Sequence, residues 1–153
     1  MDESRSSDAL AALADYHRQF LKAQRVAHLA TADAHGRLHV LPVCFAVSRN
    51  KIYITIDDKP KRADSASLKR LRNIAENPAV ALVADRYDDK NWSRLGWVMV
   101  RGKAEILDTG SERAAAQQLL RNRYPQMVAM ALERHPVIAI HIDQVTSWGD
   151  SLS

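Results

Sequence analysis

Residues 26–56 read VAHLATADAHGRLHVLPVCFAVSRNKIYITI, and this stretch decides the fold class. Val26–Thr31 and Ile52–Ile56 carry the apolar and β-branched residues typical of strands, and the second of them alternates strictly. The turn Asp33–Gly36 leads into a longer strand predicted over Arg37–Val47, and Ser48–Lys51 turns the chain into the third. Connections this short predict antiparallel pairing, because parallel neighbours need a long crossover.

Pro42 lies inside the longest of these predicted strands. A proline has no N–H to donate to a neighbouring strand. Its position therefore predicts an edge strand, a bulge, or a place where something other than a strand lies alongside.

The rest of the chain mixes helices and strands. A first helix is predicted from a cap at Ser7 or Asp8 to about Lys22, and a second from about Ser65 to Glu76, with a buried stripe of Leu68, Leu71, Ile74 and Ala75. A third is predicted from a cap at Thr109 or Ser111 to about Arg123, and a shorter helical stretch with Met127, Met130 and Ala131 follows it. Strands are predicted over Val80–Tyr87, Leu95–Leu107 with a bulge at Gly102, and Val137–Val145.

This order predicts an α+β fold, a mostly antiparallel sheet rolled into a barrel with flanking helices. We expect a single domain over residues 1–153, with an N-terminal helical segment over 1–24 and a C-terminal tail over 146–153. The regular βα alternation and the glycine-rich phosphate loop of a doubly wound nucleotide-binding domain are missing from the sequence.

Size and composition suit one globular domain: 153 residues, 46% hydrophobic and 26% charged. No apolar run approaches the ~20 residues of a membrane-spanning helix, and Met1–Arg5 does not resemble a secretory signal. We therefore expect a cytoplasmic protein. Cys44 is the only cysteine, which excludes an internal disulfide and a cysteine-cluster metal site. Within its predicted apolar strand it is expected to be a small buried hydrophobe.

The net charge of +4 is concentrated in residues 59–72, which hold six basic residues and one acidic residue. The rest of the chain holds 16 basic and 17 acidic residues. Lys59, Lys61 and Arg62 precede the predicted helix, and Lys69, Arg70 and Arg72 fall in its first two turns. A helix start attracts anions, so this basic segment indicates a small anion such as a phosphate, with a solvated basic face as the alternative. A nucleic-acid binder usually spreads its cations over a wider face.

The other candidate functional residues give weaker signals than the basic segment. Trp92, Trp97 and Trp148 could cover a ring system or anchor a core or an interface. His35 and His39 show no metal-ligand spacing, so we expect no metal site. No serine stands in a nucleophile-elbow sequence, so we expect no hydrolase.

The order and spacing of several segments resemble those of the pyridoxamine 5'-phosphate oxidase-like split β-barrel proteins. His28–Thr31, Gly36–Phe45 and Ile52–Ile56 are similar to the opening strands of that family, and Leu68–Ile74 with Asn77–Val80 is similar to its helix and following strand. Asp85–Gly102, with its tryptophans, resembles the branch assigned to the deazaflavin coenzyme F420. The resemblance covers about residues 20–148.

The resemblance implies a homodimer with a flavin or deazaflavin in a groove between two barrels. It implies that Arg70 binds the cofactor phosphate, with Lys61, Lys69 and Arg72 close by and a hydroxyl contact from Thr55. It also implies that His39, Pro42 and Val43 line the ring system, that Trp97 comes from the partner subunit, and that Trp148 closes the groove. Family members often carry a second tryptophan where this chain has Gly96, so we expect a wider pocket there.

On this resemblance we expect an oxidoreductase that uses coenzyme F420 to transfer a hydride to a small, conjugated organic substrate. The alternatives are an FMN-dependent oxidoreductase of the same fold and a non-catalytic flavin- or haem-binding module. Hydride transfer is the cofactor's chemistry, so no catalytic acid or base is assigned. Neither a nucleic acid nor a membrane is expected as a partner.

Overall fold

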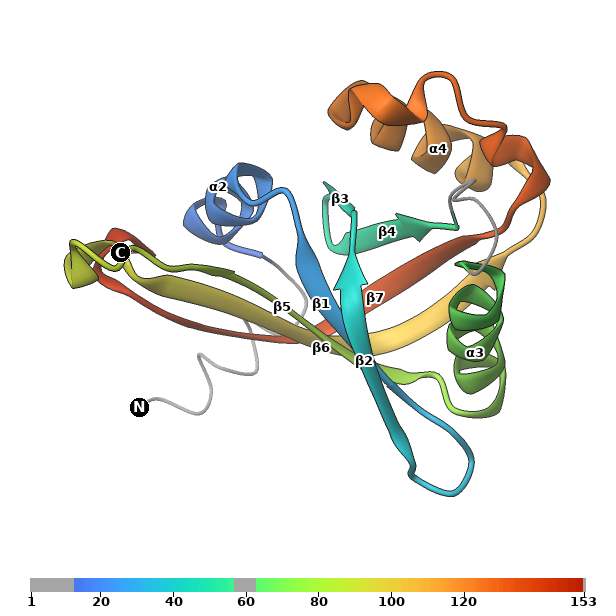
Figure 1. The fold of residues 1–153 in the computed structure, drawn as a ribbon, viewed down its shortest axis with the longest axis horizontal. Coiled ribbons are helices and arrows are strands. Elements are labelled where there is room, and N and C mark those ends of the chain that lie inside the picture. Colours follow the sequence, from blue (N-terminus) through green and yellow to red (C-terminus); the bar gives the residue numbers. More distant parts are fainter. Residues whose placement is uncertain (1–12, 57–62, 153) are drawn as a thin grey trace.

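The computed structural model describes residues 13–56 and 63–152, apart from the side chains of 63–68 and 151. Seven strands form one sheet in the order β2-β1-β5-β6-β7-β4-β3, in which all neighbours are antiparallel. The strands are β1 Ala27–Ala32, β2 Leu38–Val43, β3 Ala46–Ser48, β4 Lys51–Thr55, β5 Ala79–Arg86, β6 Gly96–Leu107 and β7 Val137–Trp148. The sheet curls into a half-barrel (Figure 1). The predicted α+β split barrel is confirmed.

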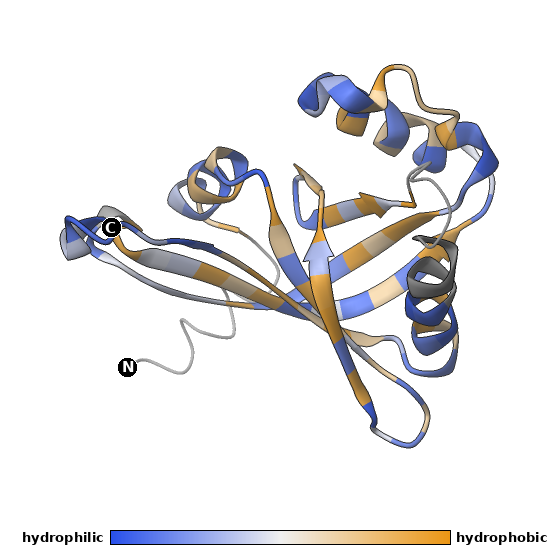
Figure 2. Cartoon of the chain, viewed as in Figure 1, coloured by the Kyte–Doolittle hydropathy of each residue, from blue (hydrophilic) through white to orange (hydrophobic). Residues whose placement is uncertain are grey.

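In the described residues, three helices and four short 3-10 turns flank the sheet. The helices are α2 Asp15–Ala23, α3 Ala63–Glu76 and α4 Ser111–Arg123, and the turns are η1 Trp92–Arg94, η2 Pro125–Met127, η3 Leu132–Arg134 and η4 Asp150–Leu152. Polar residues dominate the outer surfaces of α3 and α4, whereas the strands carry most of the apolar residues (Figure 2). No helix in the described ranges combines the length and the apolar character that a bilayer crossing requires.

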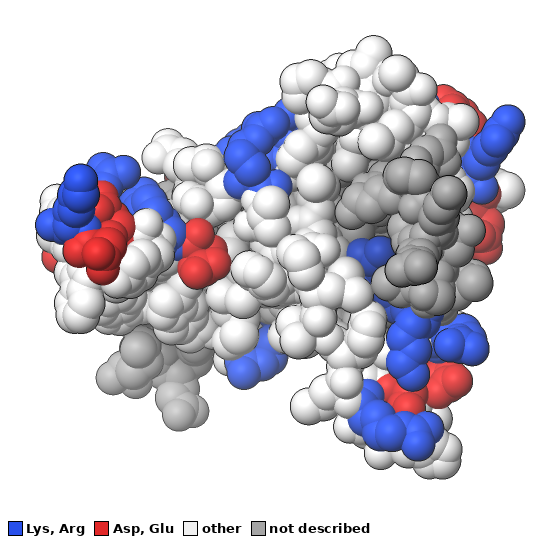
Figure 3. All heavy atoms as spheres, in the orientation of Figure 1, with Lys and Arg blue, Asp and Glu red and all other residues white. Residues whose placement is uncertain are grey.

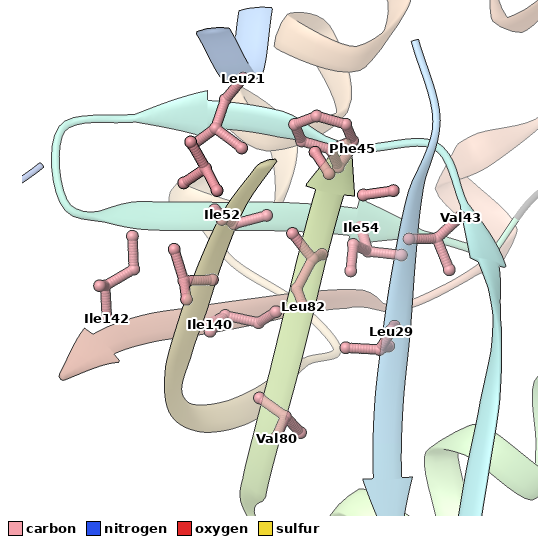
Figure 4. Close-up of a cluster of buried hydrophobic side chains, with 14 of the residues drawn as sticks. Leu21, Leu29, Val43, Phe45, Ile52, Ile54, Val80, Leu82, Ile140 and Ile142 are labelled. Carbon is pink, nitrogen blue, oxygen red and sulfur yellow. The ribbon is translucent and has the colours of Figure 1, made fainter. Parts of the chain in front are cut away.

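The core fills the concave side of the sheet. Its largest side chains come from alternate positions of the strands and from α2, and Figure 4 draws several of them, including Leu21, Leu29, Phe45, Ile52, Ile54, Leu82 and Ile140. Because successive strand residues point to opposite faces, fixing these residues inside places their neighbours in sequence on the convex face.

β6 and β7 are the two longest strands and pair from Leu107↔Val137 to Trp97↔Trp148. The register shifts between Arg101 and Gly102, which confirms the predicted bulge. A Cβ on Gly102 would lie 2.0 Å from the carbonyl oxygen of His141, so only glycine fits this approach. Past the bulge the strands continue beyond the barrel as an arm, formed by residues 84–98 and 145–152 (Figure 1).

The single strand predicted over Arg37–Val47 is wrong: the chain forms β2 and β3, which lie at opposite edges of the sheet. Cys44 and Phe45 carry the chain across. Phe45 is fully buried, and its backbone N and O both lie 3.0 Å from the Tyr124 hydroxyl. Cys44 is therefore neither in a strand nor fully buried. Pro42 lies on β2, an edge strand. Of the three predicted explanations for this proline, the edge strand is therefore confirmed.

Several boundaries also differ. Leu13 and Ala14 are not helical, so α2 begins only at Asp15, and the predicted caps Ser7 and Asp8 lie outside the described residues. The N-cap of α4 is Gly110, with no side-chain cap. Met127 lies in η2, and the predicted short helix is a pair of 3-10 turns. β7 runs to Trp148, three residues into the predicted tail.

Candidate functional site

The convex face of the sheet is largely apolar and open. The register aligns Pro42, His28, Val83, Met99 and Thr146 in one row across five strands. The neighbouring row on β2, β1 and β5 is Val40, Ala30 and Ala81, and Leu38 follows on the edge. Leu38 and Val40 are 84% and 66% exposed. Exposed apolar area of this kind marks an interaction surface.

Two hollows lie in this face. One of about 430 Å³ is lined by His28, Val83, Asp85, Trp97 and Met99. A second, of about 300 Å³, lies beside it over β2, β1 and β5 and includes Leu38, Ala81 and Arg101 in its lining. Mostly apolar walls with a few polar groups are typical of ligand pockets.

The arm brings two of the predicted aromatic residues together. Trp97 and Trp148 are direct cross-strand partners on β6 and β7, and Trp148 is 54% exposed. Trp92 lies in η1 at the tip of the arm and is exposed. A pair of adjacent indoles offers a flat apolar surface for a ring system.

The predicted widening of the pocket at Gly96 is wrong, because Gly96 faces the other side of the arm. A Cβ there would lie 3.4 Å from the Phe20 ring and 3.5 Å from the Leu152 side chain. Neighbouring strand residues point in opposite directions, so Gly96 makes room for α2 and η4, not for a ligand beside Trp97.

α3 lies over the opposite end of the sheet and turns an unexpected stripe inward. Among the helix side chains that are described, those of residues 69–76, Arg70, Asn73 and Ile74 are buried, whereas Ala75 is exposed and Leu71 is half-buried. Leu68 is among the side chains outside the described set. The predicted apolar stripe is therefore confirmed at Ile74, which is in the core, and at Leu71, which packs against it, and is wrong at Ala75. Arg70, which is 8% exposed, is an unpredicted buried residue beside it.

Arg70 shares this end of the sheet with His39. The Asn73 side-chain amide donates a hydrogen bond to the Thr31 hydroxyl at 3.0 Å, and Thr31 pairs with His39 across β1 and β2. Thr31 and His39 therefore lie under the face of α3 that carries Arg70 and Asn73. Because arginine keeps its charge when buried, this enclosed place is suited to an anionic group.

Lys69 and Arg72 face a different way. They line a polar hollow of about 280 Å³ between α3 and the β1–β2 turn, together with Asp33 and Arg37. α3 begins at Ala63, so all three predicted cations lie beyond its first turn. The helix-start argument for an anion therefore does not apply to them. Lys59, Lys61 and Arg62 lie outside the described residues.

The other predicted contacts are distributed along β2 and β4. The Val43 side chain is buried in the core, so only its backbone could meet a ligand, whereas Pro42 is exposed on the convex face. Thr55 is buried at the end of β4, where its hydroxyl donates to the Ile56 carbonyl at 3.3 Å.

Two parts of the predicted site are far apart in one chain. Thr55 pairs with Val137 at one end of β7, and Trp97 pairs with Trp148 at the other. β7 has 12 residues, so along the strand its ends are roughly 36 Å apart at about 3.3 Å per residue. α3 and the arm likewise occupy opposite ends of the molecule in Figure 1.

This arrangement matches a known family. The sequence profile of pyridoxamine 5'-phosphate oxidase matches residues 13–149. The chain belongs to the pyridoxamine 5'-phosphate oxidase family. Its predicted resemblance to that family is confirmed.

Proteins that are similar to this chain differ in the ligand or substrate that their names give. The 5a,11a-dehydrotetracycline/5a,11a-dehydrooxytetracycline reductase of Streptomyces rimosus is 28% identical over 131 residues, covering 84% of this chain and 89% of the relative. An FAD-binding protein of Mesorhizobium loti is 25% identical with a TM-score of 0.62, covering 89% of this chain and 94% of that one. A haem-binding protein of Mycobacterium smegmatis has a TM-score of 0.69 at 18% identity, covering 88% of this chain and 53% of that one, and this likeness shows the fold alone.

The sequence did not predict the chemistry of the β1–β2 turn. The Asp33 carboxylate accepts bonds from the His35 N–H, the Arg37 N–H and the Arg37 guanidinium, at 2.9, 2.9 and 2.7 Å. These bonds to Arg37, with the one from His35, lower the pKa of Asp33 to about 2. An aspartate that starts a turn and is followed by a glycine was the available signal.

Proposed function

We propose that this chain is an oxidoreductase that binds the deazaflavin coenzyme F420 and reduces a small, conjugated organic substrate. FMN in the same site is the alternative cofactor. The observation that carries the proposal is the pairing of a buried cation, Arg70, with an open apolar face that ends in Trp97 and Trp148. The relative named as a dehydrotetracycline reductase supports reduction of a conjugated compound.

The residues present fit a ring cofactor with a phosphate. Arg70 would hold the phosphate through its guanidinium fork, and the Thr55 hydroxyl would add a bond by turning from the Ile56 carbonyl to the phosphate. Pro42 and the Val43 backbone would line the ring from the convex face, whereas His39, on the other face of β2, would lie toward the Arg70 end of the ligand. When bound, the reduced ring supplies a hydride. The protein's part is to position the ring and to exclude water from it. No side chain is assigned as an acid or base.

We propose that the working site is shared between two copies of this chain. A ring with a phosphate arm is much shorter than β7, so one ligand cannot reach both Thr55 and Trp148 of a single chain. A second copy on the convex face would bring its Trp97 and Trp148 to the Arg70 end of the first. The exposed Leu38 and Val40 support this face as the contact.

The test is a side-by-side titration of the apo-protein with oxidised and reduced coenzyme F420 and with FMN. We expect binding in the micromolar range for one of the rings. Arg70→Ala should weaken it by about 1–3 kcal/mol, the worth of a charge-assisted contact. Arg134→Ala, which removes an exposed arginine from η3, is the control.

Two results would contradict the proposal. One is that neither ring binds, with a Soret band on adding haem indicating a haem-binding module instead. The other is unchanged affinity in the Arg70 variant, which would place the phosphate elsewhere.

A further inference from the structure

The polar hollow beneath the β1–β2 turn has walls from two elements. Lys69, Arg72, Asn73 and Glu76 stand on one stripe of α3, at the i, i+3, i+4 and i+7 positions that share a helix face. Asp33, His35 and Arg37 face them from the turn. Basic and acidic side chains gather over the turn and α3 at the lower right of Figure 3.

Short contacts hold these walls together. The Glu76 carboxylate accepts the Ala34 N–H at 2.9 Å, and Asn73 bonds Thr31 at 3.0 Å. Asp33 is occupied by its three bonds within the turn. Glu76 therefore fixes the turn against the helix, and Asp33 fixes the turn itself.

Lys69 and Arg72 have no such role. Within residues 13–56 and 63–152, neither the Lys69 nor the Arg72 side chain makes a hydrogen bond or an ion pair. Both nevertheless line the same hollow, three residues apart on one helix face, where like charges repel. Glu76, one turn after Arg72, offsets part of this repulsion, and an anion between the two cations would offset more of it.

We propose that this hollow is an anion site for a small dianion, either a phosphate group or a dicarboxylate. The Lys69 ammonium and the Arg72 guanidinium would bind its oxygens, and the fork of the arginine suits both chemistries. About 280 Å³ is enough for such an anion with several waters. The site is separate from that of Arg70, which is rotated by about 100° on the helix and turned to the sheet.

The test is calorimetric titration of the full-length apo-protein, at low salt, with inorganic phosphate and with malonate. We expect binding of at least one anion, and the tighter of the two identifies the source as a phosphate or a carboxylate. Lys69→Ala/Arg72→Ala should weaken binding at least about tenfold. Lys22→Ala/Lys90→Ala removes the same charge from exposed positions on α2 and the arm, and it should leave the affinity within about twofold.

Three outcomes would overturn the site: neither anion binds, the double variant binds like wild type, or Arg70→Ala abolishes binding while the double variant retains it. Arg72→Lys keeps the charge and guards against a folding defect, because it should bind more tightly than the double variant. Since no ring compound is used, failure here leaves the cofactor proposal standing, and failure of the cofactor titration leaves this site standing.

Discussion

Val40→Asp is the sharpest test of whether two copies share the site. Val40 stands on edge strand β2, pairs with Ala30 and points away from the core. If a second copy covers the convex face, a two-fold axis buries this position twice. The substitution then places two carboxylates in the contact.

The magnitude follows from exposure. Complete burial of a valine side chain is worth about 1.5–2 kcal/mol. Val40 is 66% exposed in the single chain, so its contact contributes about 1 kcal/mol per copy and about 2 kcal/mol per dimer. Each buried, unpaired carboxylate adds at least about 1–3 kcal/mol. The dissociation constant of the dimer should therefore rise about a thousandfold or more, since about 1.4 kcal/mol is a factor of ten.

Sedimentation velocity across the micromolar range measures this change. Val128→Asp is the matched control, because Val128 is 65% exposed but follows η2 beside α4, away from the convex face. We expect wild type and the control to remain dimers and Val40→Asp to dissociate. A monomeric wild type, or equal dissociation in both variants, would refute the shared site.

Three further predictions concern stability. Gly102→Ala should lower the free energy of unfolding by about 3 kcal/mol or more, because its methyl would lie 2.0 Å from the His141 carbonyl oxygen; urea titration checks this, and a loss below about 1 kcal/mol would contradict the close approach. Burial lowers the pKa of His17, whose ring accepts a backbone N–H through Nδ1 and contacts the Ser147 hydroxyl through Nε2. The free energy of unfolding should therefore fall as the pH drops below the ordinary histidine pKa of about 6.5. His17→Gln should flatten this pH dependence in urea midpoints measured from pH 7.5 to 5. The pKa of Asp33 is about 2, so the stability that the ionised carboxylate adds is present above its unfolded pKa of about 4 and is lost as the pH falls toward 2. Thermal melts of Asp33→Asn should show a lower melting temperature at neutral pH and a smaller fall of the melting temperature in acid. Identical pH dependence of the melting temperature in both proteins would argue against the turn bonds.

Much of the fold could be predicted because strand periodicity is a local property. Ile52–Ile56 alternates, and the bulge at Gly102 has a glycine as its signal. What failed is what depends on distant partners. Nothing within Arg37–Val47 indicates that the chain crosses the sheet at Cys44 and Phe45. That crossing is fixed by Tyr124, whose hydroxyl meets the Phe45 backbone from the end of α4.

The candidate site was harder to predict for the same reason. Counting charges over residues 59–72 grouped Lys69, Arg70 and Arg72 as one cluster. Helical geometry divides them, since neighbours differ by about 100° around the axis. Arg70 then faces the sheet and the other two face the turn. The apolar spacing predicted Ile74 and Leu71 against the core correctly, but it could not show that Arg70 and Asn73 are buried beside them, because the contact of Asn73 with Thr31 comes from a distant strand.

The two faces of the arm link its stability to its proposed role. On the inner face, Gly96 lets Phe20 of α2 approach, and His17 of the same helix contacts Ser147. On the other face, Trp148 follows Ser147 directly and pairs with Trp97. Because a strand residue cannot move without its neighbour, the docking of α2 sets where the indole pair stands. Loss of the His17 contact should therefore reach a ring bound against the tryptophans, although α2 itself lies on the opposite side of the sheet from them.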